Sequence, residues 1–381
     1  MTPRKLLYVA TEDWYFVSDT LPLAKAAKAQ GYDVSVAARA NGKEDIIRDA
    51  GLSFYPLDRI SRSGIGALSE ARSILELRTL YRSLAPDLVH HIALKPILYG
   101  TAAARGIAGL VLVNSVMGLG YVFTSESAKA RLLRPVMSGA LRVALAGRRS
   151  RTIVQNSDDF EAVAKLSPGA VRNLRLIRGS GVDPVKFASS PEPPGPPIVV
   201  LPARLLRDKG VGEFVAAARH LKGEGVTARF ALVGEPDADN PASVTQSEIN
   251  AWINEGIIEH WGFRPDMPAV YAQAHIVCLP SYREGLPRVL LEAAACGRAL
   301  VTTDVPGCRE VVREGVNGWL VPVRDAAALA AALRTAISSP ELRGRYAAAG
   351  RRLVAQSFTA DIIIAETLAL YDELLSCPRG A

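Results

Sequence analysis

The chain has 381 residues and a mass of 40.7 kDa, a length that suits two domains of about 150–200 residues each. Hydrophobic residues make up 49% and charged residues 22%, which excludes a disordered or collagen-like protein. The net charge of +7 is uneven: residues 1–190 hold 26 Lys and Arg against 16 Asp and Glu, or +10, and residues 191–381 hold 19 against 22, or −3. This asymmetry favours an anionic partner. Because no nucleic-acid-binding motif accompanies it, we expect a membrane surface or a phosphorylated substrate, and no nucleic acid.

Strands and helices alternate along the first half, as judged from short apolar runs and helical periodicity. The predicted strands cover residues 5–10, 32–38, 88–91, 110–113, 152–155 and 174–177. The predicted helices cover residues 21–30, 70–84 and 97–105. This alternation predicts βα units on a parallel sheet.

Residues 127–157 lack any acidic side chain and place apolar residues between their charges. The cations are Lys129, Arg131, Arg134, Arg142, Arg148, Arg149 and Arg151. A cationic amphipathic helix can lie on an anionic bilayer, where each Lys or Arg contributes about 1 kcal/mol. That interpretation makes an anionic membrane surface a partner of the basic segment 127–151. The alternative is a solvated helix that packs its apolar face on the core.

A proline-rich stretch divides the chain. Five prolines in residues 191–197 predict a stiff linker, and a second alternating series follows it. Its predicted strands cover 198–202, 228–233, 258–262, 276–280 and 300–303. Its predicted helices cover 212–222, 247–255, 287–296, 326–337 and 341–356. The fold class is therefore α/β, with two doubly wound parallel sheets that bind ligands at the carboxyl ends of their strands.

Cysteine and histidine spacing gives no sign of disulfides or metal. The four cysteines include no CxxC pair, which fits free thiols in a reducing cytoplasm. The five histidines have no metal-ligand spacing. We therefore expect a cytoplasmic protein without a metal site.

Two carboxylates eight residues apart mark the most informative segment. Glu284 and Glu292 lie in a stretch that follows a predicted buried strand and opens a helix. Backbone N–H groups around Gly285 and Leu286 would point to an anion there. The helix rises about 9 Å from Leu286 to Glu292, so one carboxylate could accept from hexose hydroxyls and the other from ribose hydroxyls. The alternative is a helix-cap acid and a surface acid.

Two cations end the first strand of the second series. Arg204 and Lys209 offer a guanidinium and an ammonium at the carboxyl edge of a sheet, which suits a diphosphate. Later strands end in Val233-Gly234 and Gly262-Phe263-Arg264, where small residues let a nucleotide approach the backbone.

Together with Gly315-Val-Asn-Gly318, these motifs resemble the C-terminal half of family 4 retaining glycosyltransferases with the GT-B fold, over nearly all of residues 198–355. The resemblance implies two Rossmann-like domains facing a central cleft, a nucleotide-sugar donor, no cofactor and a metal-independent reaction. It assigns catalytic roles to Arg204, Lys209 and Glu284. The implied donor-binding residues are Gly234, Phe263, Arg264, Gly285, Leu286 and Glu292. The implied domains are an acceptor domain over 1–190, the linker 191–197, a donor domain over 198–355, and residues 356–381, whose helix crosses back to the first domain.

The first half is similar to a subgroup that extends undecaprenyl-diphosphate-linked sugars in O-antigen, capsule or N-linked oligosaccharide synthesis, commonly with an α-linked N-acetylhexosamine. The similarity lies in residues 14–16, 90–100, 118–123 and 306–310. It implies a UDP-sugar donor, a lipid-linked saccharide acceptor and a peripheral position on the inner face of the cell membrane. The implied acceptor-binding residues are Trp14, Tyr15, His91, Lys95, Met117 and Gly118.

Three positions depart from the family pattern. Met117 stands where many members have a histidine, His90-His91-Ile92 replaces His-x-His, and Thr11–Tyr15 replaces a Gly-Gly loop after the first strand. Lys95 or His91 could compensate for the missing histidine, whereas His90 is equally well explained by core packing. A nucleotide-sugar 2-epimerase shares the two-domain architecture and is the alternative function, although the paired glutamates and paired cations argue against it.

Overall fold

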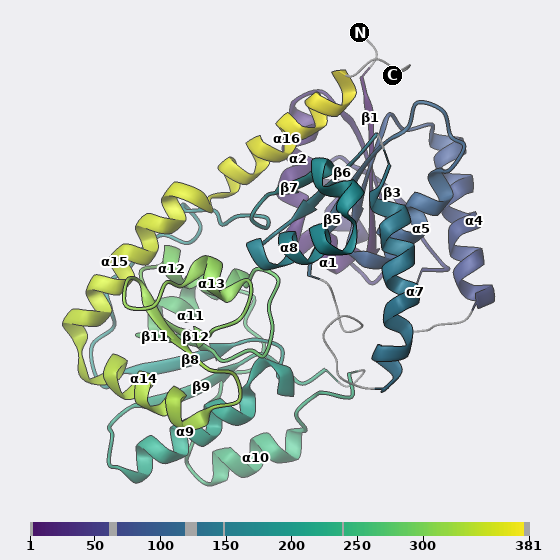
Figure 1. Ribbon diagram of the computed structural model, residues 1–381. Helices are drawn as coiled ribbons and strands as arrows, with labels where there is room; N and C mark the ends of the chain where they lie inside the picture. Colours follow the sequence, from purple (N-terminus) through teal and green to yellow (C-terminus); the bar gives the residue numbers. More distant parts are fainter. Residues whose placement is uncertain (1–2, 61–66, 119–127, 148, 238–239, 377–381) are drawn as a thin grey trace. The chain divides into compact units, whose positions relative to one another are not determined.

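The computed structural model describes residues 3–60, 67–118, 128–147, 149–237 and 240–376. The chain divides into two compact units, one formed by Met1–Ser180 with Ala360–Ala381 and the other by Gly181–Thr359 (Figure 1). Each unit contains one parallel β-sheet with helices on both faces. The predicted α/β class with two parallel sheets is confirmed.

The first unit is built on a sheet with strand order β3-β2-β1-β4-β5-β6-β7. All paired strands are parallel, so their carboxyl ends share one edge. The strands are β1 (Lys5–Glu12), β2 (Asp33–Arg39), β3 (Ser53–Pro56), β4 (Leu88–Ile92), β5 (Val111–Val116), β6 (Ser150–Val154) and β7 (Leu174–Leu176).

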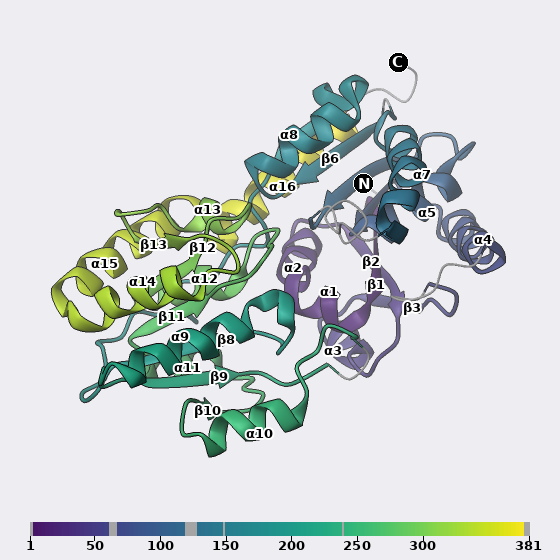
Figure 2. The same cartoon turned by 60° about the horizontal axis from the view of Figure 1, so that its bottom comes forward.

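Helices cover both faces of this sheet, so its central strands β1, β4 and β5 are buried along most of their length. The helices are α1 (Asp13–Asp19), α2 (Leu21–Ala29), α3 (Glu44–Asp49), α4 (Ala67–Leu84), α5 (Leu94–Ala104), α7 (Ala128–Leu145), α8 (Ser157–Leu166) and α16 (Ala360–Ser376). α2 and α16 pack on one face, and α4 and α5 pack on the other (Figure 2). α16 therefore belongs to the first unit, where the resemblance places the final helix.

The second unit has strand order β10-β9-β8-β11-β12-β13, again all parallel. Its strands are β8 (Ile198–Pro202), β9 (Arg229–Val233), β10 (Glu259–His260), β11 (Ile276–Leu279), β12 (Ala299–Thr303) and β13 (Gly318–Val321). Its helices are α9 (Val211–Gly223), α10 (Gln246–Asn254), α11 (Met267–Gln273), α12 (Arg288–Ala295), α13 (Cys308–Val311), α14 (Ala326–Ser338) and α15 (Pro340–Ser357).

The boundary between the units lies before the prolines, not within them as the sequence predicted. Residues 181–197, which we call the strap, pack on the second unit. The buried Arg298 donates from Nη2 to the carbonyl oxygen of Pro191 at 3.1 Å, and Arg343 binds Glu192 through two hydrogen bonds of 2.8 and 2.9 Å. Because these buried cations anchor the proline segment, it is part of a folded unit and not a free linker.

The predicted loop at Thr11–Tyr15 is also wrong. β1 continues to Glu12, and α1 begins directly at Asp13. The Asp13 carboxylate is fully buried and accepts hydrogen bonds from the backbone N–H groups of Trp14, Asn41 and Lys43 at 2.6, 2.7 and 2.9 Å. These hydrogen bonds order the junction between β1 and α1, where the sequence replaces the Gly-Gly loop that is usual in the family.

Candidate active site

The two predicted phosphate-binding cations lie just after β8, at the carboxyl edge of the second sheet. Arg204 follows the strand, and Lys209 ends the short 3₁₀ turn Arg207–Lys209. The Arg204 guanidinium is half exposed and pairs with Asp237 at 2.9 Å. Asp237 follows β9, the neighbouring strand, so the adjacent parallel strands bring this pair together.

Lys209 binds the first glutamate of the predicted pair. Its Nζ lies 2.6 Å from Oε1 of Glu284, and both side chains are largely buried, at 21% and 13% exposure. Ser281 donates from Oγ to the same oxygen at 2.6 Å. An ammonium has three N–H donors, so Lys209 can keep Glu284 and still bind a phosphate oxygen.

The loop that carries Glu284 is fixed by neighbouring segments. The N–H of Tyr282 donates to the carbonyl of Asp208 at 2.8 Å, which ties this loop to the turn of Lys209. Gly307 has φ +63°, and a Cβ there would lie 2.4 Å from the carbonyl oxygen of Gly285. α12 begins at Arg288, within one residue of the predicted start, so Gly285 and Leu286 lie in the loop that leads into it.

Two glycines allow close backbone approach beside the cations. The N–H of Gly234 donates to the carbonyl of Gly262 at 2.9 Å, and a Cβ on Gly234 would lie 1.9 Å from the carbonyl oxygen of Ala203. The next residues, Phe263 and Arg264, are exposed, Phe263 at 72%. The exposed Phe263 ring follows the point where the backbones of Gly234 and Gly262 meet, and it offers a surface on which a planar base can stack.

Glu292 is not a surface acid, so that alternative is excluded. It lies on α12 with its side chain 9% exposed, accepts from the Tyr271 hydroxyl at 3.0 Å, and is 3.2 Å from Nη2 of Arg288. Burial raises the pKa of its carboxyl group above the ordinary value, and Arg288 opposes this shift. These contacts hold the Glu292 side chain in a largely buried position in the second unit.

In the first unit, the structure corrects the assignment of His91 to the acceptor. His91 is fully buried: Nε2 lies 2.8 Å from the Tyr81 hydroxyl and Nδ1 lies 2.7 Å from Oδ1 of Asn114. Burial lowers the pKa of its imidazole to about 4. Since both ring nitrogens are engaged inside the core, His91 cannot also contact a bound saccharide or replace the missing histidine.

His90 points to the opposite face and is also a core residue. Its Nδ1 lies 2.6 Å from the Tyr371 hydroxyl on α16, and its Nε2 lies 2.6 Å from Oγ of Ser115. Burial lowers the pKa of this imidazole to about 3, so it is neutral at physiological pH. The core-packing interpretation of His90 therefore agrees with its surroundings.

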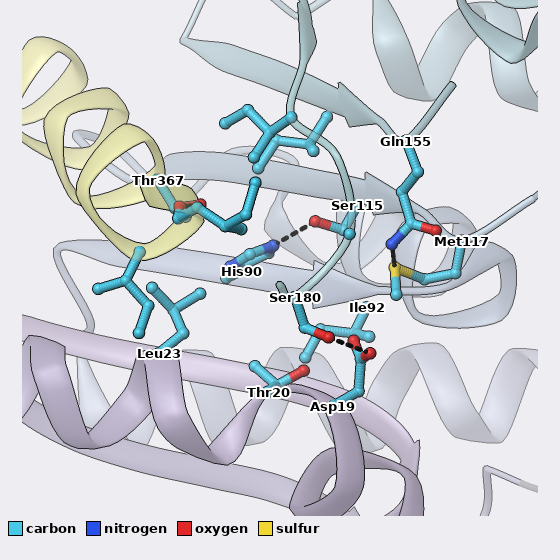
Figure 3. Close-up of a pocket in the computed structure, with 15 residues that line it drawn as sticks. Asp19, Thr20, Leu23, His90, Ile92, Ser115, Met117, Gln155, Ser180 and Thr367 are labelled. Carbon is cyan, nitrogen blue, oxygen red and sulfur yellow. Dashed lines mark hydrogen bonds between the residues drawn. The ribbon is translucent and has the colours of Figure 1, made fainter. Parts of the chain in front are cut away.

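A small cavity of about 40 Å³ lies beside His90 (Figure 3). Met117 and Gln155 form part of its wall, with Nε2 of Gln155 3.0 Å from the Met117 sulfur. Asp19 accepts from the Ser180 hydroxyl at 2.9 Å at another point of the wall. A cavity of this size holds water and is too small for a sugar ring.

The other predicted acceptor residues lie at three places in the first unit. Trp14 and Tyr15 are on α1, where Trp14 is 38% exposed and the two rings meet edge to face at 5.9 Å. Lys95 is in the first turn of α5. Gly118 follows β5 with φ +101°, and the rest of its motif, residues 119–123, lies outside the described part of the chain.

Two features at the carboxyl edges of the two sheets were not predicted from the sequence. Ser281 stands three residues before Glu284, a spacing that matches the hydrogen bond between them. Ala93, just before Lys95, has φ +74°, although it carries a Cβ. Such backbone strain costs about 1–3 kcal/mol and is found preferentially at functional sites.

Models of two protein families match the chain, one in each of the two units. "Glycosyl transferase 4-like" matches residues 5–157, and "Glycosyl transferases group 1" matches residues 182–353. The chain is a group 1, family 4-like glycosyltransferase. The group 1 match contains every predicted catalytic and donor-binding residue, and the 4-like match contains every predicted acceptor-binding residue.

Relatives of this glycosyltransferase agree with that family. The N,N'-diacetylbacillosaminyl-diphospho-undecaprenol alpha-1,3-N-acetylgalactosaminyltransferase of Campylobacter jejuni is 27% identical over 369 residues, with 93% of this chain and 95% of its own length covered. The solved structure of Anabaena HepE with UDP and glucose has a TM-score of 0.78 at 20% identity, covering 97% and 99% of the two chains. The sucrose-phosphate synthase of Thermosynechococcus elongatus has a TM-score of 0.81 at 19% identity, covering 98% and 99%. The fold is thus GT-B.

Proposed function

We propose that this glycosyltransferase transfers an N-acetylhexosamine from a UDP-sugar to a polyprenyl-diphosphate-linked saccharide during synthesis of a bacterial surface polysaccharide or glycan. The observation that carries the proposal is the placement of Arg204, Lys209 and Glu284 at one sheet edge of the second unit. The Campylobacter relative, named for an undecaprenol-linked acceptor and N-acetylgalactosamine, supports the acceptor and sugar class. The HepE complex with UDP supports the nucleotide.

The proposed reaction proceeds with retention at the anomeric carbon and without a metal ion. The bond between the anomeric carbon and the diphosphate oxygen breaks, and the acceptor oxygen forms the new bond on the same face. The leaving diphosphate takes the acceptor's proton. Arg204 and Lys209 stabilise its developing charge, as preorganised cations do. Glu284 accepts hydrogen bonds from sugar hydroxyls and forms no covalent intermediate.

We further propose that the first unit lies on the inner face of the membrane through α7. This helix buries Leu141, Ala144 and Leu145 in the core of the unit. On its outer side Val136 and Val143, seven residues apart, are 69% and 55% exposed. Exposed apolar side chains between cations suit an anionic bilayer surface. Within the described residues, no helix is both long and apolar enough to cross a membrane. The structure does not describe the side chains of Lys129 and Arg131.

The test is an assay with labelled UDP-GlcNAc, UDP-GalNAc, UDP-Gal and GDP-mannose over a panel of polyprenyl-diphosphate saccharides, with and without EDTA. The expected result is transfer from one UDP-N-acetylhexosamine, α linkage in the product by NMR, and an unchanged rate in EDTA. Absence of transfer from every donor contradicts the proposal. Conversion of UDP-GlcNAc to another sugar without any acceptor would favour an epimerase instead.

A further inference from the structure

A buried serine lies directly beneath the sugar-binding carboxylate of the proposed site. Ser281 follows β11 and has no exposed surface. Its Oγ donates to Oε1 of Glu284 at 2.6 Å. A hydroxyl at this distance from an ionised carboxylate makes a charge-assisted hydrogen bond, roughly twice as strong as a neutral one. The bond therefore restricts the carboxylate more than an ordinary side-chain contact would.

The backbone around Ser281 is held independently of that bond. The hydroxyl of Thr303, at the end of the neighbouring β12, donates to the carbonyl oxygen of Ser281. The next N–H, that of Tyr282, donates to the carbonyl of Asp208. The backbone that carries the Ser281 hydroxyl is thus fixed by two hydrogen bonds. The position of the hydroxyl that binds Glu284 is therefore fixed as well.

Two donors converge on one oxygen of Glu284. Lys209 and Ser281 each lie 2.6 Å from Oε1, and among the described residues the hydrogen bonds to this carboxylate all reach Oε1. Lys209 is a point charge on a flexible stem and constrains direction weakly, whereas the short Ser281 side chain constrains it strongly. With Oε1 held, the carboxylate torsion and the direction of Oε2 are fixed.

We propose that Ser281 is a positioning residue for sugar transfer: it orients Glu284 so that Oε2 accepts hydrogen bonds from hydroxyls of the transferred sugar. This inference rests on the proposed function. Without the Ser281 hydroxyl, the ion pair with Lys209 remains, but the carboxylate can rotate about it. A misplacement of about 1 Å at a reacting sugar lowers the rate by about 100-fold.

A positioning role for Ser281 predicts that its removal lowers turnover and leaves nucleotide binding nearly unchanged. Ser281→Ala should lower kcat by about 10–100-fold and change the Kd for UDP by less than about twofold, because Arg204 and Lys209 are untouched. Ser281→Thr, which keeps the hydroxyl, should recover most of the turnover. Equal losses in Ser281→Ala and Ser281→Thr would overturn the inference, because they would indicate a packing defect.

A double-mutant cycle tests whether Ser281 acts through Glu284. In a Glu284→Ala background, adding Ser281→Ala should cost less than about a further twofold in kcat, because the group it positions is already absent. Fully additive losses would overturn the inference.

Thr302→Val is the matched control. Thr302 is a buried residue on β12, and its hydroxyl lies 2.6 Å from the carbonyl oxygen of Leu279 and 3.2 Å from the Cys308 sulfur; within the described part of the chain its hydrogen bonds do not include Glu284. It should lower the thermal midpoint as Ser281→Ala does, with turnover within about twofold of wild type. If wild type transfers sugar and Ser281→Ala does so equally well, only the positioning role fails. If wild type transfers sugar from no donor, the proposed function fails and this inference fails with it.

Discussion

The hydroxyl of Tyr271, buried in the core, donates a 3.0 Å hydrogen bond to Oε2 of Glu292, the second of the two carboxylates eight residues apart. Arg288 approaches the other oxygen at 3.2 Å. In the proposed function Glu292 accepts from the ribose hydroxyls. We expect Glu292→Gln to raise the Kd for UDP by about tenfold, since each hydrogen bond to a charged group contributes about 1.5–3 kcal/mol.

Tyr271→Phe is the matched comparison for Glu292. It removes the hydroxyl's hydrogen bonds to Glu292 and to the Val289 carbonyl but leaves the carboxylate with Arg288, so the Kd for UDP should change by less than about threefold. Isothermal titration with UDP and with uracil separates the ribose contact from base binding. UDP affinity unchanged in Glu292→Gln would contradict the assignment.

Loss of Lys209 should act mainly on turnover. Its ammonium is held beside Glu284, and the proposed leaving diphosphate gains charge as the sugar departs. Removing one preorganised donor from such a charge typically lowers kcat by about 10²–10³-fold. Lys209→Ala is therefore expected to fall in this range, whereas Lys222→Ala, on the far end of α9 where Nζ binds the carbonyl of Gly256, should match wild type. Wild-type turnover in Lys209→Ala would remove this residue from the mechanism.

The two core histidines make the first unit sensitive to acid. Burial lowers the pKa of His90 to about 3 and that of His91 to about 4, from an ordinary value of 6.5. Below pH 6.5 the unfolded chain therefore binds protons that the folded chain does not. The stability is present above pH 6.5 and is lost as pH falls towards 4, by up to about 1.4 kcal/mol per pH unit for each histidine.

Thermal midpoints between pH 7.5 and 4.5 measure this dependence. His90→Gln should lower the midpoint at pH 7.5, because bonds to Tyr371 and Ser115 are lost, and should flatten its decrease with acid. The exposed His220, on α9, provides the control, and His220→Gln should retain the wild-type slope. A His90→Gln slope equal to that of wild type would show that His90 is protonated in the folded state.

Binding to vesicles tests the outer face of α7. A Val136→Glu, Val143→Glu double variant places two carboxylates where apolar contacts and anionic lipid are expected, so sedimentation with anionic vesicles at low salt should fall by about tenfold or more. Val185→Glu, at a valine that is 84% exposed in the second unit, should bind as wild type does. Wild-type protein that stays in the supernatant at low salt would exclude this surface.

The apolar pattern predicted the central strands well and the edge strands unevenly: β7 and β10 fall within predicted strands, and the other two edge strands do not. The prediction over 198–202 coincides with β8, because a strand buried on both faces is apolar throughout. β3 (Ser53–Pro56) and β13 (Gly318–Val321) were missed. Both are four-residue strands at the sheet edges, where polar residues and glycine interrupt the apolar run.

The sequence could not assign the histidines, because their hydrogen-bond partners lie on other helices and strands, and the apolar pattern does not show which of these pack against β4. Side chains alternate across a strand, so His90 and His91 enter opposite layers of the first unit. Tyr81 on α4 meets one, and Tyr371 on α16 meets the other, 281 residues away. In the second unit, by contrast, the rule that parallel strands share a carboxyl edge was enough to place Lys209 at the sheet edge where it meets Glu284 at 2.6 Å, although the pair itself was not predicted.

The strap changes where the second unit can be separated from the rest of the chain. Val182 and Phe187 belong to its hydrophobic core, and the N–H of Val182 donates to the carbonyl of Phe358 at 2.9 Å. A fragment that began at the first strand, Ile198, would open that core and leave the Arg343 guanidinium without its carboxylate. An independently folding donor fragment therefore has to run from Gly181 to Thr359, because Arg298 and Arg343 bind the proline segment to this unit.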